Sequence, residues 1–214
     1  MSTNSARPHR QCARQFVYQC GVTLIELVMF IIVVGIAVAG ILLVYTNTVR
    51  YSSDPVVRKQ MLSVAEALLE EVELMPFTYC DPDDANTAMA SAATVGAGGC
   101  ASTVEVIGPE AGEARYTPAT PFDNVNDYAG FDTATAAPTG IADISGTVIA
   151  ALAGYRAQIT ATAQPLGPAG SMIAAIDGNG AAQVLLVSVT VIAPDGDSLS
   201  LSGYRTRYAP NAMP

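Results

Sequence analysis

Apolar and polar residues divide the chain into regions with different patterns. From Leu27 to Val44, eighteen consecutive residues carry no charged or polar side chain. A helix rises ~1.5 Å per residue, so this run spans ~27 Å, close to the hydrocarbon thickness of a bilayer. The run therefore predicts one membrane-spanning helix, held in the bilayer by residues 24–45.

A second helical pattern follows. We expect the turn-forming residues 51–55 to break or kink the helix, with Asp54 as N-cap and Pro55 at the first position of the next helix. Apolar residues then recur at steps of three and four up to Met75, which predicts an amphipathic helix. Its apolar face consists of Val57, Met61, Val64, Leu68, Val72 and Met75. The charged residues are expected mostly on the opposite side: Arg58, Lys59, Glu66, Glu70, Glu71 and Glu73.

The last part of the chain has the alternation of strands. Residues 155–163, 182–193 and 198–208 are predicted strands, and the last two form a hairpin across the turn Asp195–Asp197. Residues 77–150 predict a long loop-rich connection with one short strand at 102–107. The predicted fold class is α+β: a long N-terminal helix, hydrophobic and then amphipathic, packed on a C-terminal antiparallel sheet.

Charge separates the two ends of the chain. The net charge is −9, but residues 1–21 carry three arginines and no acid, which gives +3. The remainder holds seven basic and nineteen acidic residues, which gives −12. Basic residues before an apolar span predict a cytoplasmic N-terminus and an exported C-terminal domain. So acidic a domain repels phosphate, and we expect no nucleic-acid partner.

The residues that most hydrolytic enzymes use are scarce. The only histidine, His9, lies in the basic segment, and beyond it the chain has no Trp and the single lysine Lys59. His-based triads and His-ligated zinc are therefore excluded there, so we predict no enzyme, no catalytic residue and no cofactor. No metal site is predicted either. Calcium remains an alternative at four closely spaced oxygen donors that lack the EF-hand pattern: Asp81, Asp83, Asp84 and Asn86.

Four cysteines allow three pairings. The predicted topology places Cys12 and Cys20 on the reducing cytoplasmic side, and Cys80 and Cys100 in the exported domain. We therefore predict a Cys80–Cys100 disulfide, worth ~3 kcal/mol on the chain-entropy account. Two buried free thiols are the alternative.

The start of the apolar span reads GVTLIEL from Gly21 to Leu27. This motif, followed by an unbroken apolar helix, resembles the class III signal of type IV prepilins. The resemblance implies that a prepilin peptidase cleaves after Gly21 and removes residues 1–21. Val22 would become the N-methylated terminus, and Glu26 would be the fifth mature residue, which acts in subunit assembly. The family usually has Phe or Met where this chain has Val22.

Glu26 also has a physical interpretation. A carboxylate near an apolar span costs up to ~3 kcal/mol at mid-bilayer. Cleavage after Gly21 creates an α-ammonium at Val22, and pairing with it, within a subunit or between subunits, neutralises the charge. The alternative is an interfacial glutamate that extends to the membrane surface without a partner.

Two further segments narrow the resemblance. Residues 122–131 read FDNVNDYAGF, and residues 76–86 read PFTYCDPDDAN. Both are similar to minor pilins of the MshD type, from the mannose-sensitive haemagglutinin pilus, and the first also to PilV-like minor pilins. Independently, Phe122, Tyr128 and Phe131 predict an aromatic-anchored loop whose Asp and Asn residues cap turns.

The resemblance implies a minor pilin that takes part in the initiation of pilus assembly or serves as a filament or tip subunit. Residues 22–75 would form the helix, and residues 76–214 a periplasmic domain. The chain would lie in the bacterial inner membrane and then in a pilus at the cell surface. Implied partners are prepilin peptidase, other major and minor pilins, the assembly platform and ATPase, and inner-membrane lipid. The alternatives are a pseudopilin of type II secretion and an unprocessed, membrane-anchored periplasmic binding domain.

Overall fold

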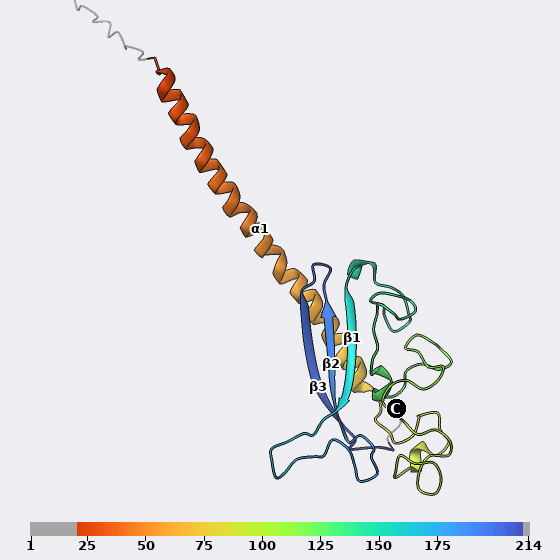
Figure 1. Cartoon of the computed structure of the whole chain (residues 1–214). Coiled ribbons are helices and arrows are strands. Elements are labelled where there is room, and N and C mark those ends of the chain that lie inside the picture. Colours follow the sequence, from red (N-terminus) through yellow and green to blue (C-terminus); the bar gives the residue numbers. More distant parts are fainter. Residues whose placement is uncertain (1–20, 212–214) are drawn as a thin grey trace, which may run out of the picture. The chain divides into compact units, whose positions relative to one another are not determined.

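The computed structural model describes residues 21–211, and for residue 47 and residues 49–54 it describes the backbone only. The predicted leader, up to residue 20, lies outside this range. A long helix α1 (Leu24–Leu74) comes first, and a three-stranded sheet comes last (Figure 1). Three 3-10 helices lie between them in the sequence: η1 (Thr87–Met89), η2 (Val125–Tyr128) and η3 (Ala150–Leu152). The strands of the sheet are β1 (Arg156–Ala163), β2 (Val184–Ile192) and β3 (Ser198–Thr206).

The chain divides into two compact units. The N-terminal unit ends at Tyr51, and the C-terminal unit begins at Ser52. Helix α1 contributes its first part to the former and its last part to the latter. An apolar N-terminal helix with a three-stranded antiparallel sheet makes the fold α+β, so the predicted class is confirmed.

The prediction that the helix breaks at residues 51–55 is wrong. Helix α1 is continuous through this segment, so Pro55 lies inside the helix and Asp54 is not an N-cap. Proline lacks an N–H and removes one backbone hydrogen bond. The turns on both sides keep their own bonds, and the residues that follow Pro55 bury an apolar face. The helix ends just before Pro76, as expected.

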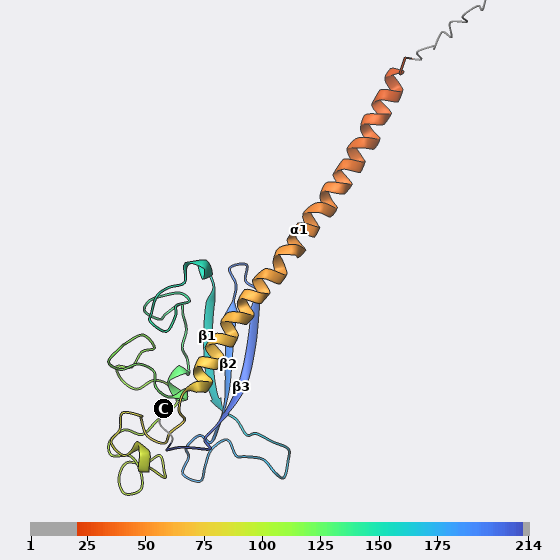
Figure 2. The same ribbon diagram turned by 180° about the vertical axis from the view of Figure 1, so that it is seen from behind.

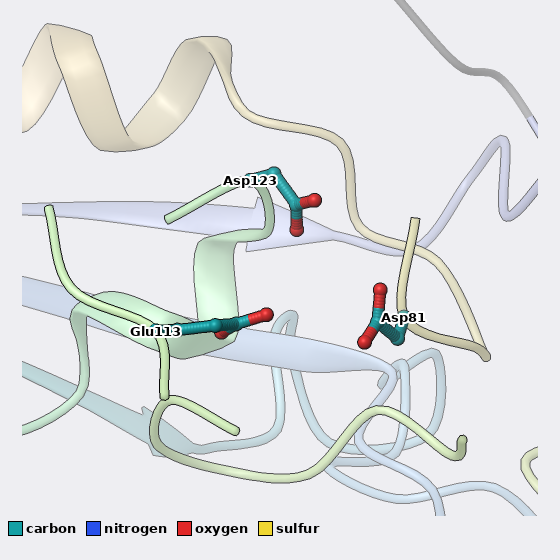
Figure 3. A group of neighbouring side chains, drawn as sticks. All are labelled: Asp81, Glu113 and Asp123. Carbon is teal, nitrogen blue, oxygen red and sulfur yellow. The ribbon is translucent and has the colours of Figure 1, made fainter. Parts of the chain in front are cut away.

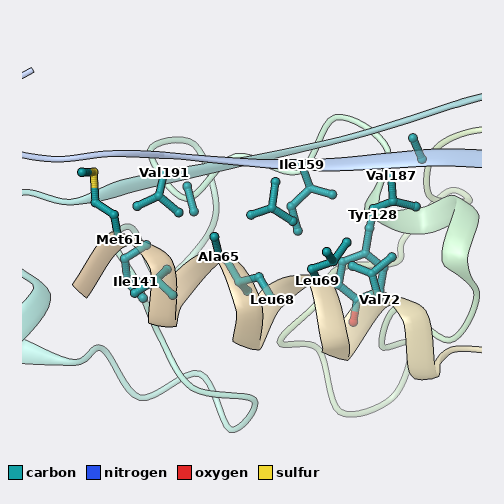
Figure 4. Packing of buried hydrophobic residues seen from close by; sticks show 14 of the residues in the cluster. Met61, Ala65, Leu68, Leu69, Val72, Tyr128, Ile141, Ile159, Val187 and Val191 are labelled. Carbon is teal, nitrogen blue, oxygen red and sulfur yellow. The ribbon is translucent and has the colours of Figure 1, made fainter. Parts of the chain in front are cut away.

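The C-terminal part of α1 packs across one face of the sheet (Figure 2). The predicted apolar face is confirmed, because Met61, Val64, Leu68 and Val72 are all buried. The structure adds two neighbouring positions to it, Ala65 and Leu69. Figure 4 shows the labelled members of this face against residues of the sheet, including Ile159, Val187 and Val191. Tyr128 and Ile141, from the long connection, close the same core.

The sheet has the order β1-β2-β3, and both pairs of strands are antiparallel. The predicted hairpin is confirmed as β2–β3, with its turn at Asp195–Asp197. The alternation of β2 is also confirmed, since its odd-numbered residues 185–191 are fully buried. On the other face, hydroxyl pairs cross from β2 to β3 at 2.8 Å: Ser188 with Ser202 and Thr190 with Ser200.

The long connection contains turns and 3-10 helices in place of the strand predicted at 102–107. Val104 makes only an isolated bridge with Cys80. The N–H groups of residues 101–103 instead donate to the carboxylate of Asp84, so they are not available to a strand ladder. Residues 130–133 run along the edge of β1 and exchange backbone hydrogen bonds with Ile159 and Ala157. This contact fixes the FDNVNDYAGF segment to the sheet.

Candidate functional site

The residues of the signal motif lie at the start of α1. Gly21, Val22 and Thr23 precede the helix, and Glu26 lies in its first turn. Thr23 caps this turn, because its side-chain oxygen accepts a hydrogen bond from the Glu26 N–H at 3.3 Å. Thr-x-x-Glu before an apolar run is the sequence pattern of a capping box. The sequence therefore contained a signal for the capping role of Thr23 that the interpretation of Glu26 as an assembly residue passed over.

The span that follows has no partner within the described residues of its own unit. Residues 24–46 form a helix long and apolar enough to cross a membrane, and all of their side chains are exposed. An uninterrupted apolar surface of this length is unfavourable in water. Lipid or apolar helices of other molecules would cover such a surface favourably.

The predicted disulfide is present in the C-terminal unit. Cys80 and Cys100 are joined across 20 positions of the sequence, and both are fully buried. Ala90, Tyr79 and Val104 pack around them in a small cluster, separate from the main core. The bridge thus holds together a loop that has little apolar core of its own.

Asp84 organises the same loop. Its carboxylate accepts hydrogen bonds from four backbone N–H groups, those of Asn86, Ala101, Ser102 and Thr103, at 2.7–2.9 Å. These bonds, led by that of Thr103, hold the pKa of Asp84 well below its usual range. Its oxygens are therefore occupied by the protein backbone. This is a structural role, and it removes Asp84 from the calcium alternative drawn from the sequence.

A buried ion pair connects α1 to the long connection. The guanidinium of Arg115 forms a two-point contact with Glu71, and the side chain of Arg115 is only 3 % exposed. Tyr128 donates its hydroxyl to the same carboxylate at 2.8 Å. Burial and the charge of Glu71 raise the pKa of Tyr128. The expectation that Glu71 faces away from the core is wrong, because Arg115, distant in the sequence, supplies its counter-charge.

The FDNVNDY segment is the aromatic-anchored loop that the sequence predicted. Tyr128 is buried, and Phe122 and Phe131 pack against the core beside it. Phe122 contacts both other rings edge to face, with centroids 5.1 and 6.0 Å apart. The carboxylate of Asp127 caps η2, because its Oδ2 accepts the N–H groups of Asp123 and Asn124 at 2.9 and 2.8 Å.

Acidic side chains from distant segments gather beside η2 in two groups. In the first, Asp81, Glu113 and Asp123 point their carboxylates toward a common space (Figure 3). In the second, Glu105, Glu110 and Asp127 do the same, with Glu105 and Asp127 buried. Within each group, one carboxylate oxygen from each residue lies within 4.8 Å of the others. We call these the outer and the inner acidic group.

Burial and mutual repulsion disfavour the charged form of these acids. Burial, with the charge of Asp127 next in importance, raises the pKa of Glu105 to about 10, of Glu113 to about 8 and of Asp123 to about 7. Burial also raises the pKa of Asp127 to about 6, although the N–H groups of Asn124 and Asp123 partly offset it. Such raised values mark a place where a proton or a cation is strongly favoured.

A groove lies between the last part of α1 and the loop around η3. Its volume is about 630 Å³. Apolar side chains such as Leu68, Ile141 and Ile149 line most of it, and Lys59 and Asp143 lie among the polar lining residues. Such a groove could accept an apolar group, but nothing in the described residues identifies one.

Sequence reasoning located some of these features and missed others. The cysteine pair, the aromatic loop and the apolar span were all predicted. The two acidic groups and the Glu71–Arg115 pair were missed, since their members are up to 44 positions apart and show no local spacing pattern. A usable signal was the presence of acids in a loop-rich region with only one basic residue, Arg115, between Lys59 and Arg156.

Comparisons of the chain with models of known families, with curated proteins and with solved structures gave no match.

Proposed function

We propose that this chain is a pilin-type subunit, held in a membrane by residues 24–46 and packed through that helix into a filament. The observation that carries the proposal is the motif GVTLIEL. It places one carboxylate, Glu26, in the first turn of an otherwise apolar helix, directly after the pair Gly21–Val22. Cleavage after Gly21 would place a positive α-ammonium close to that carboxylate.

The physical state of the N-terminal unit supports this proposal. Its exposed apolar side chains are stable in lipid, and equally so against neighbouring helices of the same kind. Glu26 is the one acid in residues 21–51, and its charge needs a partner in either surrounding. The α-ammonium of a neighbouring subunit would meet this need in a filament.

The C-terminal unit supports the second half of the proposal. Its α-helix-on-sheet core and its disulfide suit a domain that is exported and then displayed. The FDNVNDYAGF segment favours a minor pilin of the MSHA type over a type II secretion pseudopilin. Prepilin peptidase, other pilins, the assembly platform with its ATPase, and inner-membrane lipid are then the partners. The subunit would initiate assembly or occupy the filament or its tip.

Intact-mass measurement of the membrane-extracted protein tests the processing step. We expect the mass of a chain that begins at Val22, with an additional methyl group. Gly21→Leu should accumulate the uncleaved form, because the peptidase would meet a bulky side chain at the cut. A parent chain that retains residues 1–21 would overturn the proposal and favour an unprocessed anchored domain.

Glu26→Gln tests the assembly step. Glutamine retains a polar side chain for the first helical turn and removes the charge. We expect normal cleavage but about tenfold less protein in sheared filaments, the effect of ~1.4 kcal/mol. Glu66→Gln, at another exposed acid of α1, is the matched control and should assemble normally.

Thr23→Ala separates capping from charge pairing. It removes the side-chain acceptor of the first turn and leaves the charge of Glu26 in place. We expect assembly close to that of the parent. If Thr23→Ala impairs assembly as much as Glu26→Gln does, then helix capping, not charge pairing, is the role of this turn.

A further inference from the structure

The inner acidic group contains buried carboxyl oxygens that have no hydrogen-bond partner among the described residues. Glu105 is 6 % exposed, and neither of its carboxylate oxygens has a hydrogen-bond partner. Asp127 is 1 % exposed, and its Oδ1 is also unpartnered, while its Oδ2 accepts two backbone N–H groups. Burying an unpaired charge costs several kcal/mol. Two such acids within 4.8 Å of each other therefore need a neutralising partner.

The basic residues nearby form no direct ion pair with it. Arg207 lines the same cavity as Glu105, and the charge of Glu105 favours the charged form of Arg207, but within the described residues the two are not paired and Nε and Nη1 of Arg207 are buried without partners. Its guanidinium instead lies over the rings of Phe77 and Tyr79, 4.3 and 4.5 Å from their centroids. Arg115 is engaged by Glu71. The outer acidic group, close by, adds further negative charge.

The carboxylates are held at a suitable separation for an ion. We propose that Glu105, Glu110 and Asp127 bind one calcium ion. Three oxygens that all lie within 4.8 Å of one another have a common point at most about 2.8 Å from each, and calcium takes oxygen ligands at 2.3–2.6 Å. A small contraction therefore forms the site. Magnesium requires 2.0–2.1 Å and near-octahedral geometry, which demands a larger movement.

Further oxygen ligands are at hand. Asn126 is 1 % exposed, its side-chain oxygen is unpartnered, and it lines the same cavity of about 290 Å³ as Glu105. Calcium takes six to eight oxygens, and the cavity can admit water molecules as the remainder. A buried amide oxygen in the cavity that Glu105 lines is a donor of the kind that a hard cation prefers.

The backbone around the inner group is already ordered. The Glu105 N–H donates to the Tyr79 carbonyl at 3.1 Å, and the Gly108 N–H donates to the Asn126 carbonyl at 3.1 Å. Gly108 has a φ of +102°, which side chains rarely adopt, so glycine allows this turn. An ion at the inner group would thus join the 105–110 loop to η2. Its role would be to stabilise the long connection.

A shared proton is the competing solution. Protonated Glu105 could donate to Asp127 and neutralise half of the pair without any metal. The two solutions differ for Glu105→Gln, whose amide mimics the protonated acid. With a shared proton, this variant keeps or raises the stability of the parent and the parent does not respond to calcium. With a calcium site, the variant loses the response of the parent to the ion.

The test uses the full chain in detergent, stripped with EDTA and dialysed at pH 7.5 and fixed ionic strength. Bound ions are counted by equilibrium dialysis with calcium chloride alone, and thermal unfolding is followed by the near-ultraviolet circular dichroism of the tyrosines. We expect saturable binding of one calcium per chain and a rise in Tm of several degrees. Magnesium chloride should give a smaller rise at equal concentration.

Three variants make the result specific. Glu105→Gln should weaken calcium binding at least tenfold. Glu110→Gln, at a half-buried position that tolerates the change more easily, should weaken it in the same direction. Glu66→Gln, an exposed acid on α1, should bind calcium as the parent does.

The absence of saturable calcium binding to the parent would overturn the proposal, and so would unchanged binding by both Glu105→Gln and Glu110→Gln. A rise in Tm that potassium chloride reproduces at equal ionic strength would also overturn it, since it would reflect screening of the acids. None of these outcomes bears on cleavage after Gly21 or on Glu26, which are tested separately.

Discussion

The two parts of helix α1 differ in what surrounds them, although both are rich in apolar residues. From Leu24 to Thr46 every side chain is exposed. From Val57 to Met75 one face is covered by the sheet, and Met61, Ala65 and Val72 are at most 1 % exposed. Amino-acid composition alone does not tell which of these two segments contributes to the core and which is exposed. Among the described residues, the sheet covers the second segment, whereas the first is not covered within its own unit.

The difference extends to polar groups. In the N-terminal unit, Glu26 is exposed and has no ion pair among the described residues. In the C-terminal unit, Glu71 is covered and is compensated by Arg115 and Tyr128. Folding energy is therefore concentrated beyond residue 52. Substitutions in the two parts should have very different effects on unfolding of the C-terminal unit.

The largest effect is expected at the buried ion pair. Arg115→Met should lower the free energy of unfolding by about 4 kcal/mol, because it leaves Glu71 covered without a counter-charge. Arg156→Met is the control: Arg156 pairs with Asp132, but its side chain is 44 % exposed, and we expect a loss below about 1 kcal/mol. Guanidinium unfolding of the full chain in detergent, followed by tyrosine circular dichroism, measures both. Equal losses would contradict the assignment of Arg115 to the core.

A matched pair of leucines tests the helix comparison directly. Leu68→Ala should lower the free energy of unfolding of the C-terminal unit by about 3 kcal/mol, because it leaves a cavity between helix and sheet. Leu42→Ala, at an exposed position of the same helix, should leave that unfolding transition unchanged. Both proteins are measured as full chains in the same detergent. A comparable loss for Leu42→Ala would show that the apolar span contributes to the fold of the C-terminal unit.

The last comparison concerns the pH dependence of the stability of the C-terminal unit in the absence of calcium. The folded-state pKa values of Glu105, Glu113, Asp123 and Asp127 lie above those of an unfolded chain. Between about pH 5.5 and pH 8 the folded state therefore holds more protons than the unfolded state. Stability must fall as the pH rises through this window, by about 1.4 kcal/mol per pH unit for each proton that only the folded state holds.

The measurement is the Tm of the EDTA-stripped chain at the two pH values. Asp84 and Asp132 do not oppose the trend, because their lowered pKa values keep them ionised in both states over this window. Calcium should reduce the fall, since it replaces the protons as the neutralising charge. A Tm that increases from pH 5.5 to pH 8 without calcium would contradict the raised pKa values of the inner acidic group.

Local patterns were sufficient for a large part of the fold. The alternation of Leu185, Val187, Val189 and Val191 predicted which face of β2 is buried, because side chains in a strand alternate between two faces. The apolar positions from Val57 to Met75 predicted the covered face of α1 for the analogous reason. The helix and the hairpin each depend on residue spacing within one short segment, which can be read from the sequence. The disulfide prediction depends on which cysteines are expected to share a compartment, and that expectation also comes from the sequence.

Some local inferences were incomplete. Pro55 was expected to start a helix, yet it lies within one, because the hydrogen bonds of the neighbouring turns outweigh the single bond it lacks. Residues 102–107 have the alternation of a strand, but Asp84 occupies the N–H groups that a ladder would need. At residues 102–107, a partner outside the local window decided the outcome.

The sequence by itself determined that one apolar helix precedes an α+β domain, that its two cysteines can pair, and that Gly21 and Glu26 flank the entry to the span. Only the tertiary structure decided which charges are buried. Glu71 meets Arg115, and Glu105 meets Asp127, across separations at which sequence spacing carries no information about distance. Whether a charge is favourable depends on the solvent and the counter-charges around it, and these are fixed only when distant segments fold together.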